Sequence, residues 1–184
     1  MAELPAVHTT AIPGLLQVDL DLRGDRRGWF KENYQEAKLR AAGLPDLVFV
    51  QNNVSYNAEP GVTRGVHAEP WDKYVSIAAG RAFAAVVDLR RGDGLGRVVT
   101  AELTPSVALL VPSGCGNAFQ TLEPHTVYTY LVTAHWSPDV RYVGVDPFDP
   151  DLAIPWPVPR ERTVLSDKDA ANPRLRDVPP VERP

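Results

Sequence analysis

The chain has 184 residues, of which 44% are hydrophobic, and a formal net charge of −4. This length and apolar content suffice for one buried core, so we expect residues 1–184 to form a single domain. Charges of both signs are spread along the chain, which argues against binding to a nucleic acid phosphate backbone. No apolar run approaches the roughly 20 residues that span a bilayer, so we expect no membrane role.

The first residues, MAELPAVHTT, have neither the basic nor the apolar region of a signal peptide, and the single cysteine, Cys115, cannot form an internal disulfide. We therefore expect a cytoplasmic protein.

Short segments rich in Val, Phe, Tyr and Thr recur along the chain and predict an all-β protein. Eighteen prolines, about twice the usual share of roughly 5%, and glycine-containing turns such as PSGCG separate these segments. This spacing is typical of a sandwich or barrel. In chain order the segments are residues 15–20, 47–55, 73–80, 81–90, 96–103, 107–112, 117–122 and 126–136.

One helix is predicted in the N-terminal region, over ENYQEAKLRAAG at residues 32–43. Glu32 suits its first turn, Lys38 and Arg40 suit its last turn, and Gly43 is a C-terminal stop. After Trp156 the chain becomes rich in proline and charge, which favours short helical turns or coil.

The spacing of Gly61, His67, Glu69, Lys73 and Gly80 resembles the first motif of cupins, small β-barrels that often bind metals. In the metal-binding form, two histidines stand at 67 and 69 and a glutamate at 73. The second motif resembles PSGCGN, at residues 112–117, with Asn117 in place of a histidine. The resemblance implies an all-β, cupin-type jelly roll, a double-stranded β-helix.

The exchanged residues argue against a metal site. A divalent cation needs deprotonated donors, whereas the Lys73 ammonium offers only protons and a repelling charge. What remains is an imidazole at His67, an ammonium at Lys73 and an amide at Asn117, in a fold whose mouth suits a small molecule. This set suits proton transfer beside a carbonyl, with the imidazole as base and the ammonium steadying an enolate oxygen.

A more specific resemblance covers residues 12–175. The segments DRRGWFKE, FVQNNVS, TRGVH, AFAAVVDLRRG, DPDLAIPWP and LSDKDAANPRL are together similar to the dTDP-4-dehydrorhamnose 3,5-epimerase family. Its members are cupin-type jelly rolls, usually homodimers, that work without a metal or an organic cofactor. They epimerise C3 and C5 of a dTDP-4-keto-6-deoxyhexose through an enolate, which implies the same dTDP-linked substrate class and no cofactor here.

The resemblance implies four catalytic residues. The family base falls on His67 and its aspartate partner on Asp169. The acid falls on Tyr130, although Tyr128 lies on the same face of the predicted strand and periodicity alone does not separate the two. Lys73 matches the lysine near the C4 oxygen.

The resemblance also implies nine substrate-binding residues, with arginines and lysines for a diphosphate and amides for a base edge. An aromatic ring at position 136 would stack on the nucleotide. Members of the family often lend an N-terminal strand and its arginine to the partner subunit's site. The nine positions are Arg27, Phe30, Glu32, Gln51, Asn53, Arg64, Asn117, Trp136 and Lys168.

The chain departs from the family pattern at several positions around the mouth. Asn117 replaces a histidine, Leu131 a lysine and Arg141 a glutamate, and HAEPWDK shortens the connection between His67 and Lys73. Single and double epimerisation therefore both stay open. Two other classes also stay open, namely a metal-dependent cupin isomerase or oxygenase and a non-catalytic cupin that binds a sugar nucleotide.

Overall fold

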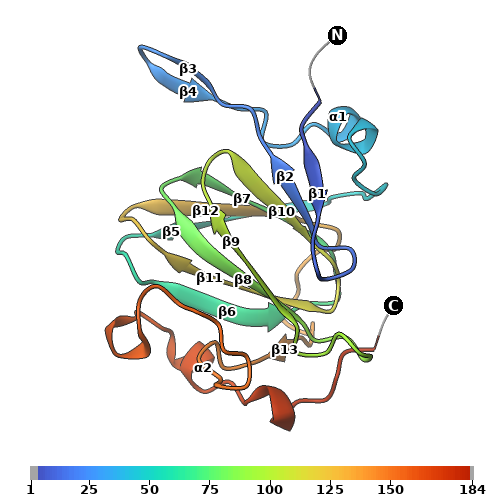
Figure 1. Cartoon of the computed structure of the whole chain (residues 1–184), viewed down its shortest axis with the longest axis vertical. Coiled ribbons are helices and arrows are strands. Elements are labelled where there is room, and N and C mark those ends of the chain that lie inside the picture. Colours follow the sequence, from blue (N-terminus) through green and yellow to red (C-terminus); the bar gives the residue numbers. More distant parts are fainter. Residues whose placement is uncertain (1–3, 183–184) are drawn as a thin grey trace.

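The computed structural model describes residues 4–182, and its centre is two antiparallel sheets that face one another (Figure 1). This confirms the predicted all-β, cupin-type jelly roll, formed by two open sheets that are not joined into a closed barrel. The six-stranded sheet runs in the order β1 (Val7–Thr9), β2 (Leu16–Asp19), β10 (Val107–Val111), β7 (Lys73–Ala79), β12 (Thr126–Val132) and β5 (Gln51–Asn57). The five-stranded sheet runs in the order β13 (Val143–Gly144), β6 (Thr63–Ala68), β11 (Cys115–Thr121), β8 (Ala82–Asp88) and β9 (Val98–Leu103).

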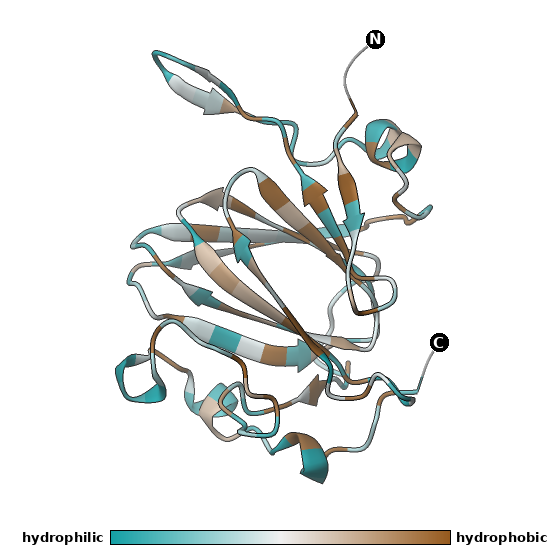
Figure 2. Cartoon of the chain, in the orientation of Figure 1, coloured by the Kyte–Doolittle hydropathy of each residue, from teal (hydrophilic) through white to brown (hydrophobic). Residues whose placement is uncertain are grey.

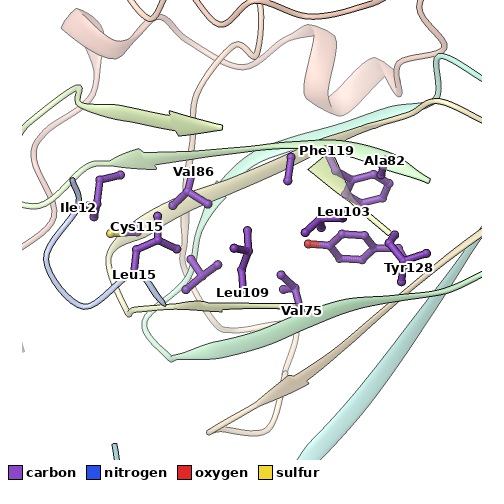
Figure 3. Packing of buried hydrophobic residues seen from close by; sticks show 13 residues of the cluster. Ile12, Leu15, Val75, Ala82, Val86, Leu103, Leu109, Cys115, Phe119 and Tyr128 are labelled. Carbon is purple, nitrogen blue, oxygen red and sulfur yellow. The ribbon is translucent and has the colours of Figure 1, made fainter. Parts of the chain in front are cut away.

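The main hydrophobic core fills the space between the two sheets. Val75 and Ile77 of β7 point into it from one side, and Val86 of β8 and Phe119 of β11 belong to the same buried cluster. Figure 3 shows these contacts between side chains from both sheets. Side chains alternate along a strand. The odd-numbered residues of β7, such as Val75, and of β11, such as Phe119, therefore face the interior.

Each sheet also has an apolar outer face. Tyr74 of β7 packs in a second cluster with Leu39 of the helix that follows the first strands. Val66 of β6 packs in a third cluster with Leu152 of the C-terminal tail. Strands covered on both faces have nearly continuous apolar sequences, which explains the unbroken runs in β7 and β8 and the brown segments across the sandwich in Figure 2.

The predicted helix is shorter than expected, because α1 covers only Glu36–Ala41. The Gln35 side chain caps it by accepting a hydrogen bond from the Lys38 backbone N–H at 2.6 Å, so the first turn begins beyond Glu32. The prediction that Glu32 lies in the first turn was therefore wrong. Gly43 follows the last turn with a φ of +110°, which confirms it as the stop.

A two-stranded hairpin, β3 (Arg23–Asp25) and β4 (Gly28–Phe30), projects away from the sandwich (Figure 1). The predicted segments did not include it, because three-residue strands are too short for a clear alternation. Its second strand carries two exposed aromatic side chains, Trp29 and Phe30, whose relative exposures are 45% and 65%.

The C-terminal tail runs beneath β6 (Figure 1) and contains only short helical pieces, as predicted: η1 (Arg160–Arg162), α2 (Asp167–Ala170) and η2 (Leu175–Asp177). The Ser166 hydroxyl caps α2 by accepting from the Asp169 backbone N–H at 3.1 Å. This cap sets the position of Asp169 against the sandwich. Within residues 4–182, no helix is long and apolar enough to cross a membrane.

Candidate active site

Polar side chains gather inside one end of the sandwich, where the strands place them on the inner faces. Asn117 lies opposite His67 in the pairing of β11 with β6, within the five-stranded sheet. Tyr130 lies opposite Asn53 in the pairing of β12 with β5, within the six-stranded sheet. His67 and Tyr130 therefore belong to opposite walls of the interior.

His67 and Asp169 form a close pair although 102 positions separate them. The imidazole Nε2 lies 2.6 Å from the Asp169 carboxylate, and the second carboxylate oxygen accepts the Gly65 backbone N–H at 3.3 Å. A carboxylate only accepts hydrogen bonds, so Nε2 carries the proton and Nδ1 keeps its lone pair. This is the tautomer that a general base requires.

The protonation state of Asp169 supports this assignment. Burial of the carboxyl works to raise its pKa, but the hydrogen bonds from His67, Gly65 and the Ser166 cap outweigh it and lower the pKa below its ordinary value. The carboxylate is therefore ionised at neutral pH and accepts the hydrogen bond of the His67 Nε2–H.

Gly65 allows β6 to approach β11 beside His67. A Cβ atom built at Gly65 would lie 2.6 Å from the Asn117 carbonyl oxygen and 2.7 Å from the Ala118 Cα. Its φ of +112° is also one that L side chains rarely adopt. Only glycine fits here, which explains the glycine two residues before the histidine.

Gly65→Ala is expected to lower the free energy of unfolding by about 3 kcal/mol, because a steric clash adds to the strain of the backbone. Gly43→Ala is the matched control, since Gly43 has a similar φ of +110° but no atom within 4 Å of the added Cβ. Urea denaturation of both variants separates the two effects. Equal losses in both would show that the close approach to β11 has no energetic role.

Lys73 begins β7 and is buried, and it forms an ion pair with Glu69. Burial lowers the pKa of Lys73, and the Glu69 carboxylate opposes this shift. The Lys73 Nζ also lies 6.0 Å from the centre of the Tyr130 ring. The sequence placed Glu69 at a ligand position of the metal-binding frame but assigned it no role. No local spacing rule predicts its pair with Lys73, because residues 69–72 form a bend between two strands and not a helix.

The structure distinguishes the two tyrosines that periodicity could not separate. Tyr128 is fully buried, stacks on Phe119 with 4.0 Å between ring centres, and donates its hydroxyl to the Asn117 side-chain oxygen at 3.2 Å. Tyr130 is only partly buried, and its ring lies beside the Lys73 ammonium. Burial and the nearby Glu69 raise the pKa of Tyr130, so its phenol keeps its proton at neutral pH.

Tyr142 is a site residue that the sequence did not indicate. Its ring packs edge-on against His67, with 5.4 Å between ring centres. The Lys168 Nζ contacts the Tyr142 hydroxyl and lies 4.6 Å from the centre of its ring. Tyr142 thus lies between the predicted Lys168 and His67 and contacts both. It precedes the short edge strand β13 and belongs to no recognisable sequence motif.

The residues expected to bind the nucleotide lie around the edge strand β5. The Gln51 side chain donates to the Asn53 side chain at 2.8 Å and accepts the Trp136 backbone N–H at 3.0 Å, and the Trp136 side chain is exposed. Arg64 on β6 donates to Asn57 at 3.0 Å and is close enough to Tyr130 to lower its pKa. These four predicted residues therefore lie on β5 or in contact with its side chains.

Arg27, Phe30 and Glu32 do not join this site within the chain. Arg27 pairs with Asp25 at the hairpin tip, Phe30 is exposed, and Glu32 pairs with Lys38. The hairpin that carries Arg27 and Phe30 projects away from the sandwich (Figure 1).

Two departures from the family pattern have a structural explanation. Leu131 faces outward and packs against the cluster of Tyr74 and Leu39, so this position lies on the opposite side of the sheet from Tyr130. The shortened connection is fastened by Asp72, whose backbone N–H donates to the Thr133 hydroxyl and whose carboxylate accepts the Ser113 N–H, both at 3.1 Å.

No group of three or more His, Cys, Asp or Glu side chains that could hold a metal ion occurs within the part of the chain that the structure describes.

Comparison with known proteins agrees with this geometry. A family model described as dTDP-4-dehydrorhamnose 3,5-epimerase matches residues 9–177. A curated relative named Protein RmlC homolog, from Streptococcus pyogenes, is 43% identical over 93% of this chain and 89% of its own length. A solved structure of RmlC from Streptococcus suis in complex with dTDP-D-xylose is 39% identical and has a TM-score of 0.92. The match covers 98% of this chain and 96% of that chain.

A second solved structure, of RmlC from Legionella pneumophila in complex with dTDP-4-keto-L-rhamnose, is 31% identical with a TM-score of 0.85, and the match covers 95% of this chain and 94% of that chain. The similarity therefore extends over sequence and fold alike and confirms the resemblance predicted from the motifs. On these grounds the chain belongs to the dTDP-4-dehydrorhamnose 3,5-epimerase family.

Proposed function

We propose that this protein epimerises C3, C5 or both in a dTDP-linked 4-keto-6-deoxyhexose, by proton removal and return through an enolate, in deoxysugar biosynthesis. The observation that carries this proposal is the placement of His67 and Tyr130 on opposite walls of the interior. Inversion of a carbon centre requires a base on one face of the sugar and an acid on the other.

In the proposed mechanism, Nδ1 of His67 removes the proton from the carbon beside the ketone, and Asp169 stabilises the imidazolium. The electron pair of the broken C–H bond forms the enolate, whose oxygen lies near the Lys73 ammonium. Tyr130 then donates its phenolic proton to the opposite face of the same carbon. Solvent later returns a proton to Tyr130 and takes one from His67, so both residues recover their starting forms.

We propose that Gln51 and Asn53 bind the thymine edge, that Trp136 stacks on the base, and that Arg64, Asn117 and Lys168 lie on the diphosphate side. The hydrogen bonds that join Gln51 to Asn53 and to the Trp136 backbone support this placement, because they hold the three residues together. Preformed sites of this kind lose little conformational entropy on binding.

The experiment that tests the reaction is proton NMR in heavy water with a panel of 4-keto-6-deoxy sugar nucleotides. Deuterium incorporation at C3, at C5 or at both carbons, together with the inverted sugar, is the expected result. It also measures how many centres are inverted and which nucleotide is preferred. A sugar that stays unchanged and unlabelled with every nucleotide would favour the non-catalytic binding protein.

The metal-dependent alternative makes a different prediction. It requires a stoichiometric metal in the purified active protein and loss of turnover on chelation. The buried pair of Lys73 and Glu69 at two positions of the metal-binding frame favours the epimerase, because an ammonium repels a cation.

We also propose that residues 1–184 form one domain and that two copies form a homodimer in which the hairpin, with Arg27 and Phe30, and Glu32 reach the partner subunit's site. An exposed apolar stripe along β5 and the residues before it supports an interface there, because exposed edge strands and apolar patches are common sites of association between chains. The stripe consists of Val48, Val50, Val54 and Tyr56, with relative exposures of 72%, 41%, 64% and 58%.

Sedimentation equilibrium is expected to give about twice the chain mass of 20.2 kDa. Val54→Lys should shift the protein toward the monomer, because it buries a charge at the interface. Leu95→Lys is the matched control, since Leu95 is also exposed but lies in the connection between β8 and β9. A monomeric wild type would contradict the proposed dimer.

A further inference from the structure

The ion pair of Lys73 and Glu69 lies inside the proposed site and plays no part in the packing of the apolar clusters. The side chains have relative exposures of only 5% and 15%. Removing two charges from water is costly, so a buried pair of this kind is weak evidence for stability. Its position beside Tyr130 suggests a role in the reaction instead.

The backbone holds the Glu69 carboxylate in place. Glu69 follows β6 directly and lies two positions after His67, and its carbonyl accepts the Gly114 N–H at 3.3 Å. Three residues later, Asp72 is fastened to Ser113 and Thr133. The connection from β6 to β7 is thus hydrogen-bonded to neighbouring segments at both of its ends. These bonds restrict its movement and so hold Glu69 and Lys73 at a fixed separation.

We propose that Glu69 is a positioning residue of this epimerase site, whose carboxylate holds the Lys73 side chain as an ammonium directed at the enolate oxygen. This inference rests on the proposed function. A fixed cation inside a water-poor site stabilises a developing oxyanion far more than it would in water. A neutral amine at the same place would lose most of that effect.

The charges around the pair agree with this role. Burial lowers the pKa of Lys73, and Glu69 is the charged neighbour that raises it. Glu69 also raises the pKa of Tyr128, of Tyr130 and of Lys168. The adjacent strand β10, Val107–Val111, carries no titratable side chain. The other charged or titratable groups of the site are Arg64, His67, Tyr142 and Asp169.

The sign of the effect follows from these contacts. Without the Glu69 carboxylate, Lys73 loses its proton at lower pH. The alkaline limb, where kcat/KM falls with rising pH, therefore moves to lower pH. Glu69→Gln is expected to move this limb of kcat/KM for solvent deuterium exchange by about one pH unit or more. The loss of activity should be smaller well below the limb than above it, since Lys73 is still protonated at the lower pH.

Two companion variants test the assignment. Glu69→Asp keeps the charge and should restore the limb to within about half a pH unit of wild type. Glu102→Gln removes the surface partner of Arg81, 2.6 Å away, and should leave the profile unchanged. Because Glu69 also raises the pKa of Tyr130, the Glu69→Gln shift is measured again in Tyr130→Phe protein, which removes the contribution of that phenol.

A uniform loss of activity at every pH in Glu69→Gln, with no shift of the limb, would overturn the inference and indicate a structural role. A second measurement works on the unaltered protein without substrate. The side-chain ¹⁵N signal of Lys73, assigned by its loss in Lys73→Arg, is expected to be that of an ammonium at pH 8, and a neutral amine would overturn the inference. This signal still tests the protonation state of Lys73 if Glu69→Gln does not fold. A wild type that exchanges no sugar would instead refute the proposed function, on which this inference rests.

Discussion

His67→Asn is expected to reduce turnover of the 4-keto sugar nucleotide by about 10,000-fold, the upper range for loss of a positioned general base. Asparagine can still accept or donate a hydrogen bond beside Asp169, but it has no basic lone pair. The affinity for dTDP should change by less than about threefold, because the proposed base-binding residues Gln51, Asn53 and Trp136 are linked to one another independently of His67. Turnover is measured by NMR and affinity by calorimetry.

The chain offers a matched control in a second histidine–aspartate pair. His8 Nε2 lies 2.8 Å from the Asp19 carboxylate, but both side chains are about half exposed, on the edge strand β1 and its neighbour β2. His8→Asn removes the same kind of pair and should leave turnover near the wild-type rate. Near-normal deuterium exchange in His67→Asn would show that another group is the base.

Tyr130→Phe is expected to slow net epimerisation by about 100-fold to 1,000-fold, while deuterium exchange at the same carbon slows by less than about tenfold. His67 still forms the enolate in this variant, but the phenolic proton for the opposite face is missing. After the His67 imidazolium has exchanged its proton for a deuteron from solvent, it returns the deuteron to the original face, so hydrogen exchanges without inversion. The ratio of exchange to inversion, measured by NMR in heavy water, should therefore rise sharply.

Tyr128→Phe is the control for this ratio. It removes the hydroxyl that donates to Asn117 at 3.2 Å and leaves the stack on Phe119. A loss of about 1 kcal/mol in the free energy of unfolding is expected, with no change in the ratio of exchange to inversion. If Tyr128→Phe raised the ratio and Tyr130→Phe did not, the acid would be Tyr128.

Much of this architecture was predictable because it depends on patterns between near neighbours. Alternating and continuous apolar segments indicated eight of the strands, and proline and glycine marked their ends. The spacing from Gly61 to Gly80 placed His67 and Lys73 on the frame of a cupin. The predicted helix start was wrong because Gln35, a weak capping residue by type, is the N-cap, so the first turn lies beyond Glu32.

The sequence by itself determined the fold class, the family and the residue types of the proton-transfer set, since each of these is a matter of residue identity and local spacing. The tertiary structure alone decided which groups meet. It brings Asp169 to His67 across 102 positions, buries Tyr128 more deeply than Tyr130, and pairs Glu69 with Lys73. The physical reason is that period and spacing give the face on which a side chain lies, whereas depth, pairing and protonation depend on what the rest of the folded chain packs against that face.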